Sequence, residues 1–292
     1  MLLPLMAACT SPPPPAPPPD VLVVVIDTLR ADALSAYGNP RETTPQIDAL
    51  AAAGVLFTDV TSPASWTWPG HASLFTGVPQ WVNGARTRSG AAETGGSALA
   101  SYAPMRQDLP TLAGRFSAAG YHTTSLSENS WLDPDLGLVR GFDRAEVRKD
   151  GCGPLWDAAV QTAEGRSNQP LFMFINMMLP HAPWGISPSP WSQPHAAIID
   201  APPPWAAPFI SPERRLDLYQ PLGPGQPSGF QAHMSGQRPI PDSGLAVIRD
   251  LYEGEVAAAD YCFHRGLTQW LERRPGSIVV LTSDHGEYLG ER

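Results

Sequence analysis

The sequence is poor in positive charge and in long apolar runs, and each shortage narrows the class of protein. Lysine and arginine number 19 against 28 acidic residues, which gives a net charge of -9. This balance argues against a polyanion-binding surface of the nucleic-acid type, although one local positive site could still bind a small anion. Beyond the first residues, no segment is apolar for long enough to span a bilayer. We also find no internal repeats.

Length and composition predict a folded chain. The 292 residues suffice for one large α/β domain or two modest ones, and 42% hydrophobic with 16% charged residues is ordinary for a protein with a core. Cysteines are few: Cys9, Cys152 and Cys262. The last two could pair in an exported protein, but the sequence does not decide this. The 34 prolines are concentrated in two places, which predicts a linker and a loop.

The first twenty residues begin apolar, reach small residues and Cys9, and continue as a polyproline tether. This order resembles a bacterial lipoprotein signal, in which the cysteine is lipidated and becomes the mature amino terminus. We therefore expect residues 1–20 to be a signal and tether, with any membrane attachment through Cys9. The resemblance implies a periplasmic or outer-membrane-anchored lipoprotein. The alternative is a disordered extension, because no Lys or Arg precedes the short apolar stretch.

From residue 21 onward, apolar strand patterns alternate with helical patterns. The predicted strands are 21–27, 55–60, 121–127, 171–178 and 277–283, and the predicted helices are 45–54, 69–76, 109–120, 155–165 and 245–272. The last helix carries one apolar stripe that includes Tyr252, Val256 and Ala259. Alternating βα units predict a doubly wound, mainly parallel sheet flanked by helices.

Two stretches do not follow this alternation. Residues 77–105 are rich in Gly, Ala and Ser and are expected to be irregular, whereas 183–241 is rich in Pro and Trp and is too long for an ordinary connection. We expect the second stretch to be an insertion that covers the site as a loop or lid. Its tryptophans could stack sugar rings, cover lipid or form a small core of the loop. Because the chain stops nine residues after Ser283, we expect a C-terminally shortened version of a larger protein.

Polar side chains that could bind a metal follow the first and the last predicted strands. Asp27 ends the first strand, and Asp284 and His285 follow the last. Ligands gather at the carboxyl ends of parallel strands. A buried carboxylate needs a partner, and a divalent cation is the partner that would draw these three residues together. An Asp after a strand can instead cap a following helix.

Thr67 lies at the amino end of a predicted helix, two residues before Pro69. A hydroxyl there faces free backbone N–H groups and the positive end of the helix dipole, which favours an alkoxide and a bound tetrahedral anion. The alternative is an ordinary N-cap. His71, one turn inside the same helix, could reach the same anion, or could be a partly buried structural histidine.

Four segments, 27–32, 67–77, 172–183 and 283–291, together resemble the sulfatase family of the alkaline phosphatase superfamily. The resemblance implies that residues 21–292 are an incomplete sulfatase-like catalytic domain with the insertion 183–241. It implies a metal bound by Asp27, Asp284 and His285, and Thr67 as nucleophile and metal neighbour. It also implies that His181 contacts the ester group and that His71 lies nearby.

The sequence departs from the family pattern at several of these positions. Family sulfatases carry Cys or Ser at the nucleophile, which is oxidised to formylglycine, and an Arg where His71 stands. The methyl group of Thr67 would turn the same oxidation into a ketone, so the formylglycine mechanism is closed. Thr28 stands where an Asp is usual, and His285 where Asn is common. Fewer carboxylates and one imidazole favour zinc or manganese over a calcium cage.

These observations predict a metal-dependent hydrolase of sulfate or phosphate esters that acts through Thr67. The expected cofactor is one divalent ion, zinc, manganese or calcium, and the expected substrate is a small anionic ester, which a glycan or a lipid could carry. The alternatives are a phosphoryl transferase of the phosphoethanolamine or lipoteichoic acid type, and an inactive relic or binding protein. His181, after a strand and beside Pro180, is placed to protonate a leaving oxygen or bind a non-bridging one.

Overall fold

The structure, a computed structural model, describes residues 18–87, 102–166, 168–182, 184, 232 and 242–291. Cys9, the polyproline tether and most of the insertion 183–241 lie outside the described residues, so the predictions made for them stay predictions. Within the described part of the chain, no helix combines the length and the apolar composition that crossing a bilayer requires.

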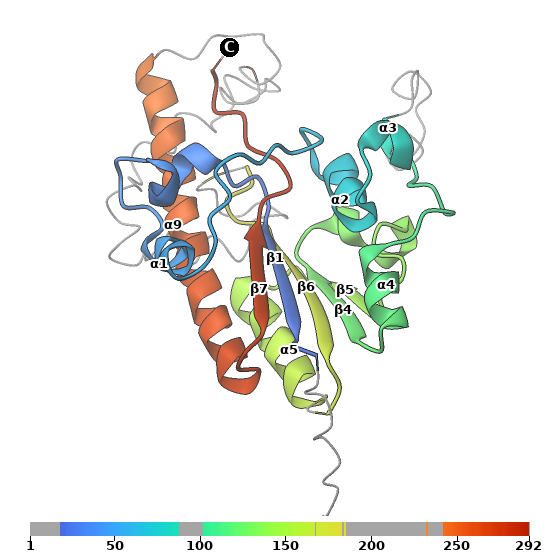
Figure 1. The fold of residues 1–292 in the computed structure, drawn as a ribbon. Helices are drawn as coiled ribbons and strands as arrows, with labels where there is room; N and C mark the ends of the chain where they lie inside the picture. The colour runs from blue at the N-terminus through green and yellow to red at the C-terminus, as the bar shows by residue number, and fades with distance from the viewer. Residues whose placement is uncertain are drawn as a thin grey trace, which may run out of the picture.

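A five-stranded sheet forms the centre of the described fold (Figure 1). The strands are β1 (Val21–Ile26), β4 (His122–Ser127), β5 (Arg144–Val147), β6 (Leu171–Met177) and β7 (Ile278–Thr282). Their order is β5-β4-β6-β1-β7, and every pairing between them is parallel. The predicted parallel sheet is confirmed, and the strands β1 and β6 are buried on both faces as their apolar runs indicate. The strand β4 is also buried, although most of its residues are polar.

Helices cover both faces of the sheet (Figure 1). They are α1 (Pro45–Ala53), α2 (Thr67–Thr76), α4 (Leu112–Ala118), α5 (Cys152–Glu164) and α9 (Asp242–Arg273). Alternate residues of β1 belong to two separate cores: Leu22 and Val24 pack with α5 and α9, and Val23 and Val25 pack with α2 and α4. This three-layer arrangement confirms the predicted doubly wound class.

The long helix α9 owes its position to the apolar stripe seen in the sequence. Tyr252, Val256 and Ala259 are each fully buried against the sheet and α5. Asp260 on the same helix accepts hydrogen bonds from the backbone N–H groups of Gln46 and Ile47, at 3.2 and 2.7 Å. A side chain distant in sequence therefore caps the amino end of α1.

Several short elements were not predicted. They are the helix α3 (Gln80–Asn83), the antiparallel pair β2 (Arg86–Thr87) and β3 (Tyr102–Ala103), and single turns of 3-10 helix at Ala31–Ala33, Ser35–Tyr37, Ser130–Leu132 and Pro134–Leu136. The edge strand β5 was also missed, because its four residues include Arg144 and Glu146 and lack an apolar run. Residues 77–87 and 102–105 are thus more regular than expected.

The predicted strand at 55–60 is wrong. These residues form no strand, and Val55, Phe57 and Val60 are 80%, 68% and 69% exposed. The apolar pattern resembles that of a strand, but β-propensity reflects packing on a sheet surface, and no described strand pairs with this segment.

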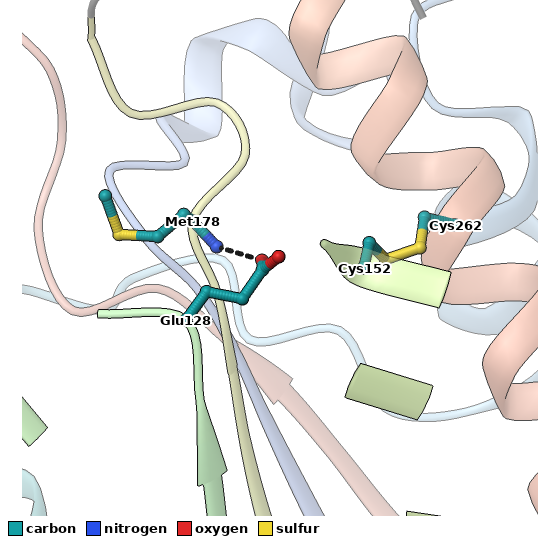
Figure 2. The surroundings of a disulfide bond; sticks show 4 residues. All are labelled: Glu128, Cys152, Met178 and Cys262. Carbon is teal, nitrogen blue, oxygen red and sulfur yellow. Dashed lines mark hydrogen bonds between the residues drawn. A yellow bond between two sulfur atoms is a disulfide. The ribbon is translucent and has the colours of Figure 1, made fainter. Parts of the chain in front are cut away.

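A disulfide joins the two helices that cover one face of the sheet. Cys152, the first residue of α5, is bonded to Cys262 of α9, with their Cα atoms 6.4 Å apart (Figure 2). The bond links positions 110 residues apart in the sequence. The pairing that the sequence left open is therefore made in the folded chain.

Candidate active site

Strand register brings the two ends of the described chain together. Val25 of β1 pairs with Thr282 of β7, and Ile26 pairs with Met177 of β6. Asp27, whose backbone N–H donates to the Met177 carbonyl at 2.9 Å, and Asp284 then leave the sheet from neighbouring strands at the same edge. The residues predicted from separate motifs meet because the strands that precede them are adjacent and parallel.

Asp27, Asp284 and His285 form a buried cluster. Each offers one ligand atom, and these atoms lie within 4.8 Å of one another. The Nε2 atom of His285 is 3.4 Å from Asp284 Oδ2 and 3.8 Å from Asp27 Oδ1. Two carboxylates and one imidazole at this spacing match the donor set of a zinc or manganese site.

The hydrogen bonds around these carboxylates leave one oxygen of each free. Asp27 Oδ1 and Asp284 Oδ2 are buried and have no hydrogen-bond partner, whereas their sister oxygens are bonded. Two buried anionic oxygens without hydrogen bonds, facing each other, would be costly unless a cation lies between them. The residues present therefore fit a divalent metal ion.

The tautomer of His285 suits a ligand. Its Nδ1 atom lies 2.7 Å from the carbonyl oxygen of Gly286, which can only accept, so Nδ1 carries the proton. The lone pair is then on Nε2, the nitrogen that faces the two aspartates. A backbone carbonyl that fixes the outer nitrogen is the usual support of a metal-binding histidine.

The two carboxylates differ in acidity. Burial raises the pKa of Asp27, and the negative charge of Asp284 raises it further. Burial alone would also raise the pKa of Asp284, but the close contact and charge of His71, 3.3 Å from Oδ2, followed by the charge of His285, bring it below its ordinary value. Asp284 is therefore the more anionic ligand, and a cation would bring Asp27 to the same state.

Thr67 is the first residue of α2 and not its N-cap. Trp66 occupies the cap position, with extended backbone, and makes no side-chain cap bond. The alternative that Thr67 is an ordinary N-cap is therefore wrong. Its hydroxyl Oγ1 lies 3.4 Å from His285 Nε2, beside the candidate metal site. The hydroxyl is held by the helix and directed at the cluster.

His71 contacts Asp284 from inside the same helix. Its Nδ1 atom lies 3.1 Å from the carbonyl oxygen of Thr67 and 3.3 Å from Asp284 Oδ2. The ring is fully buried and packs against Phe75 and Phe174. This geometry favours a role in orienting Asp284, and contact of His71 with an anion stays a prediction.

Gly70 allows α2 to approach the candidate metal site closely. A Cβ atom at this position would lie 3.2 Å from the carbonyl oxygen of Asp284 and 3.6 Å from its Cβ. The first turn of α2, which carries Thr67, therefore packs directly on the backbone of a candidate ligand. Glycine is needed here for close approach and not for an unusual dihedral angle.

His181 lies at the end of the loop that follows β6. Its backbone N–H donates to the Met178 carbonyl at 2.7 Å, and its Nδ1 donates to the Ala182 carbonyl at 2.5 Å. The side chain is half-buried and close enough to Asp27 to lower the pKa of that carboxyl. It is not bonded to Thr67, so its role toward an ester stays a prediction.

Thr28 takes a backbone conformation that is rare for a β-branched residue, with φ of 58°. Its N–H donates to Asp284 Oδ1 at 3.2 Å, and its carbonyl accepts from the Tyr252 hydroxyl at 2.8 Å. These contacts hold the turn in a strained state next to the cluster. The buried Thr28 hydroxyl has no hydrogen-bond partner.

Two amides of the site were missed in the sequence. Asn129, just after β4, and Asn176, in β6, both donate to Asp27 Oδ2, at 2.7 and 3.3 Å. Each lies at the carboxyl end of a central strand. The pattern that predicted Asp27, a polar residue at the end of a buried strand, could therefore have predicted these two amides as well. An amide at a strand end orients a carboxylate as well as a hydroxyl or a charged group does.

Comparison with known proteins finds similarity to sulfatases over part of the chain. Residues 19–150 match the family model described as sulfatase. Arylsulfatase A of Bos taurus is 47% identical over 51 residues, which are 18% of this chain and 10% of that protein. The Delta 4,5-hexuronate-2-O-sulfatase of Bacteroides thetaiotaomicron is 29% identical over 121 residues, which are 41% of this chain and 22% of that protein.

A solved structure extends the match to the rest of the fold. The phosphonate monoester hydrolase of Agrobacterium radiobacter superposes with a TM-score of 0.64 at 21% identity, over 94% of this chain and 64% of that one. The chain thus shares its fold with this hydrolase, and its first half is similar to the sulfatase family over residues 19–150. It spans less than two thirds of the length of these proteins.

Proposed function

We propose that the protein is a metal-dependent hydrolase of sulfate or phosphate-type esters in which Thr67 is the nucleophile. One observation carries the proposal: the Thr67 hydroxyl lies 3.4 Å from a histidine nitrogen whose lone pair, together with two unpartnered buried carboxylate oxygens, faces a single point. A sulfatase-family match and a phosphonate monoester hydrolase of the same fold support this class of reaction.

Asp27, Asp284 and His285 would hold the divalent ion. When bound, such an ion lowers the pKa of a neighbouring hydroxyl and stabilises negative charge on the transferred group. The donor set favours zinc or manganese over calcium.

Thr67 Oγ, after its proton is released to solvent, would attack the sulfur or phosphorus in line, forming a threonyl ester as the bond to the substrate oxygen breaks. The free N–H groups at the start of α2 face the non-bridging oxygens, and His181 would protonate the departing oxygen. Water then attacks the threonyl ester and restores the hydroxyl. The Cβ methyl of Thr67 excludes an aldehyde, so this ester takes the place of formylglycine chemistry.

The relatives also suggest what the ester belongs to. The similar Bacteroides protein is described as a hexuronate 2-O-sulfatase, which favours a sulfated or phosphorylated sugar as substrate. The internal disulfide favours an oxidising compartment, and we propose that the protein is exported, with lipid attachment at Cys9.

The test compares Thr67→Ala with Thr76→Ala. Thr76 belongs to the same helix, but its hydroxyl donates to the Ala72 carbonyl at 2.6 Å, at the end of the helix away from the cluster. Both variants should melt as the parent does, and only Thr67→Ala should lose turnover of aryl sulfates, aryl phosphates and phosphonate monoesters. A chelator should abolish the parent activity, and zinc or manganese should restore it.

Two results would count against the proposal. Undiminished turnover by Thr67→Ala would remove the assigned nucleophile. A parent chain that melts cooperatively but binds neither zinc nor manganese in calorimetry would be a binding protein or relic and not this enzyme.

A further inference from the structure

Asn129 lies between the proposed nucleophile and a proposed metal ligand. Its side-chain Nδ2 is 2.7 Å from Asp27 Oδ2 and 3.4 Å from Thr67 Oγ1, and the residue is 5% exposed. The amide orientation is determined by its other end, because Oδ1 accepts the backbone N–H of Trp131 at 2.9 Å. The NH2 group must therefore face Asp27 and Thr67.

The residue is held rigidly. Its backbone N–H donates to Ser127 Oγ at 2.9 Å, and the same hydroxyl contacts the carbonyl of Asn129 at 3.2 Å. Asn129 is also the N-cap of the short helix Ser130–Leu132. An amide anchored at both ends costs little entropy when it donates to a reacting oxygen.

Asn176 provides an internal comparison. It donates to the same oxygen of Asp27, at 3.3 Å, and its own Oδ1 accepts from Ser127 Oγ at 3.0 Å. Both amides therefore hold Asp27 so that Oδ1, the oxygen without a partner, faces the cluster. Of these two amides, only Asn129 lies within hydrogen-bond distance of Thr67.

We infer that Asn129 is a catalytic residue that donates one N–H to Thr67 Oγ and the other to Asp27 Oδ2. The first hydrogen bond stabilises the negative charge that develops on Oγ as the threonine attacks, and again as it leaves the threonyl ester. A neutral donor that is already in place does this without gaining or losing a proton. The distance of 3.4 Å is typical of a catalytic contact that shortens when charge develops.

This inference rests on the proposed function and adds to it a specific donor. Asn129→Ala and Asn176→Ala each remove one donor from Asp27, but only the first removes the donor from Thr67. Both should weaken zinc binding, measured by calorimetry, by about 10- to 100-fold. At saturating zinc, Asn176→Ala should regain a kcat near that of the parent, whereas Asn129→Ala should stay about 100- to 1,000-fold slower.

Asn129→Ser serves as a second variant, since serine retains the capacity to cap the helix but lacks the amide that reaches Thr67. It should melt close to the parent and share the kcat defect of Asn129→Ala.

The outcomes distinguish the role of Asn129 from the proposed function of Thr67. Equal kcat of the Asn129 and Asn176 variants at saturating zinc, with Thr67→Ala inactive, would overturn the role of Asn129 and leave the proposed function standing. Full activity of Thr67→Ala would overturn both.

Discussion

Replacing Glu128 with glutamine should remove a large part of the pH dependence of stability. Glu128 follows β4, is 7% exposed, and accepts the backbone N–H of Met178 at 2.8 Å (Figure 2). Burial raises the pKa of Glu128 from 4.5 to about 7, with a further contribution from the charges of Asp150 and Asp27. The hydrogen bond from Met178 opposes this rise but does not cancel it.

The sign follows from proton binding. Between pH 4.5 and about 7, the folded protein keeps a proton on Glu128 that the unfolded chain has released. The contribution of Glu128 to the free energy of unfolding is therefore fully present below pH 4.5 and is lost as pH rises through the folded-state pKa of about 7. At about 1.4 kcal/mol per pH unit, this displacement corresponds to a loss of about 3 kcal/mol.

Urea unfolding at pH 4.5, 6, 7 and 8, with a chelator present, measures the effect. Glu128→Gln keeps an acceptor for the Met178 N–H and cannot ionise. Between pH 4.5 and 8, its free energy of unfolding should therefore fall by about 3 kcal/mol less than that of the parent. Other buried acids, such as Asp260 with its pKa raised to about 6, contribute to both proteins and cancel. Glu128→Ala should be less stable at every pH, because it strands the N–H, yet should show the same reduced slope.

The reasoning fails if Glu128→Gln loses stability between pH 4.5 and 8 as steeply as the parent does. That result would mean that the carboxyl ionises in the folded protein as it does in the unfolded chain.

Three further predictions concern the disulfide, a close helix contact and the metal. Reducing the Cys152–Cys262 bond, which closes a span of 110 residues, should lower the free energy of unfolding by about 2–4 kcal/mol in urea titrations. Gly266→Ala would place a Cβ 1.9 Å from the Trp156 ring, so overpacking should cost about 1–3 kcal/mol or more in the same assay. Zinc at 100 times its Kd should stabilise the parent by about 2.7 kcal/mol, and Asp284→Asn should lose most of this gain in thermal melts.

Each of these has a matched control. The stability of Cys152→Ser should not change with reductant. If reductant destabilises this variant as well, the loss of stability does not come from the Cys152–Cys262 bond. Gly153→Ala, whose Cβ would meet nothing closer than 3.9 Å, should cost little, and equal losses at positions 153 and 266 would refute the packing argument. Asp108→Asn, at the surface, should keep the full zinc stabilisation, and a zinc response retained by Asp284→Asn would exclude that residue as a ligand.

Much of the fold and part of the site could be predicted because the sheet is parallel and buried. Strands β1 and β6 read as continuous apolar runs, and the residues at their ends were therefore candidates for one edge. The same logic failed at residues 55–60, where the apolar pattern has no described partner strand, and at β5, whose four residues include charges. Strand pairing is a tertiary property that local pattern does not determine.

The sequence by itself determined which side chains stand at strand ends and that position 67 cannot form an aldehyde. It also determined that the candidate metal ligands are two carboxylates and one imidazole. Only the tertiary structure decided how these groups face one another. It placed His71 next to Asp284, left Asp27 Oδ1 and Asp284 Oδ2 without hydrogen bonds, and brought Asn129 to Thr67. The physical reason is that hydrogen-bond direction and burial depend on strands and helices that meet from distant parts of the chain, whereas residue type and spacing are local.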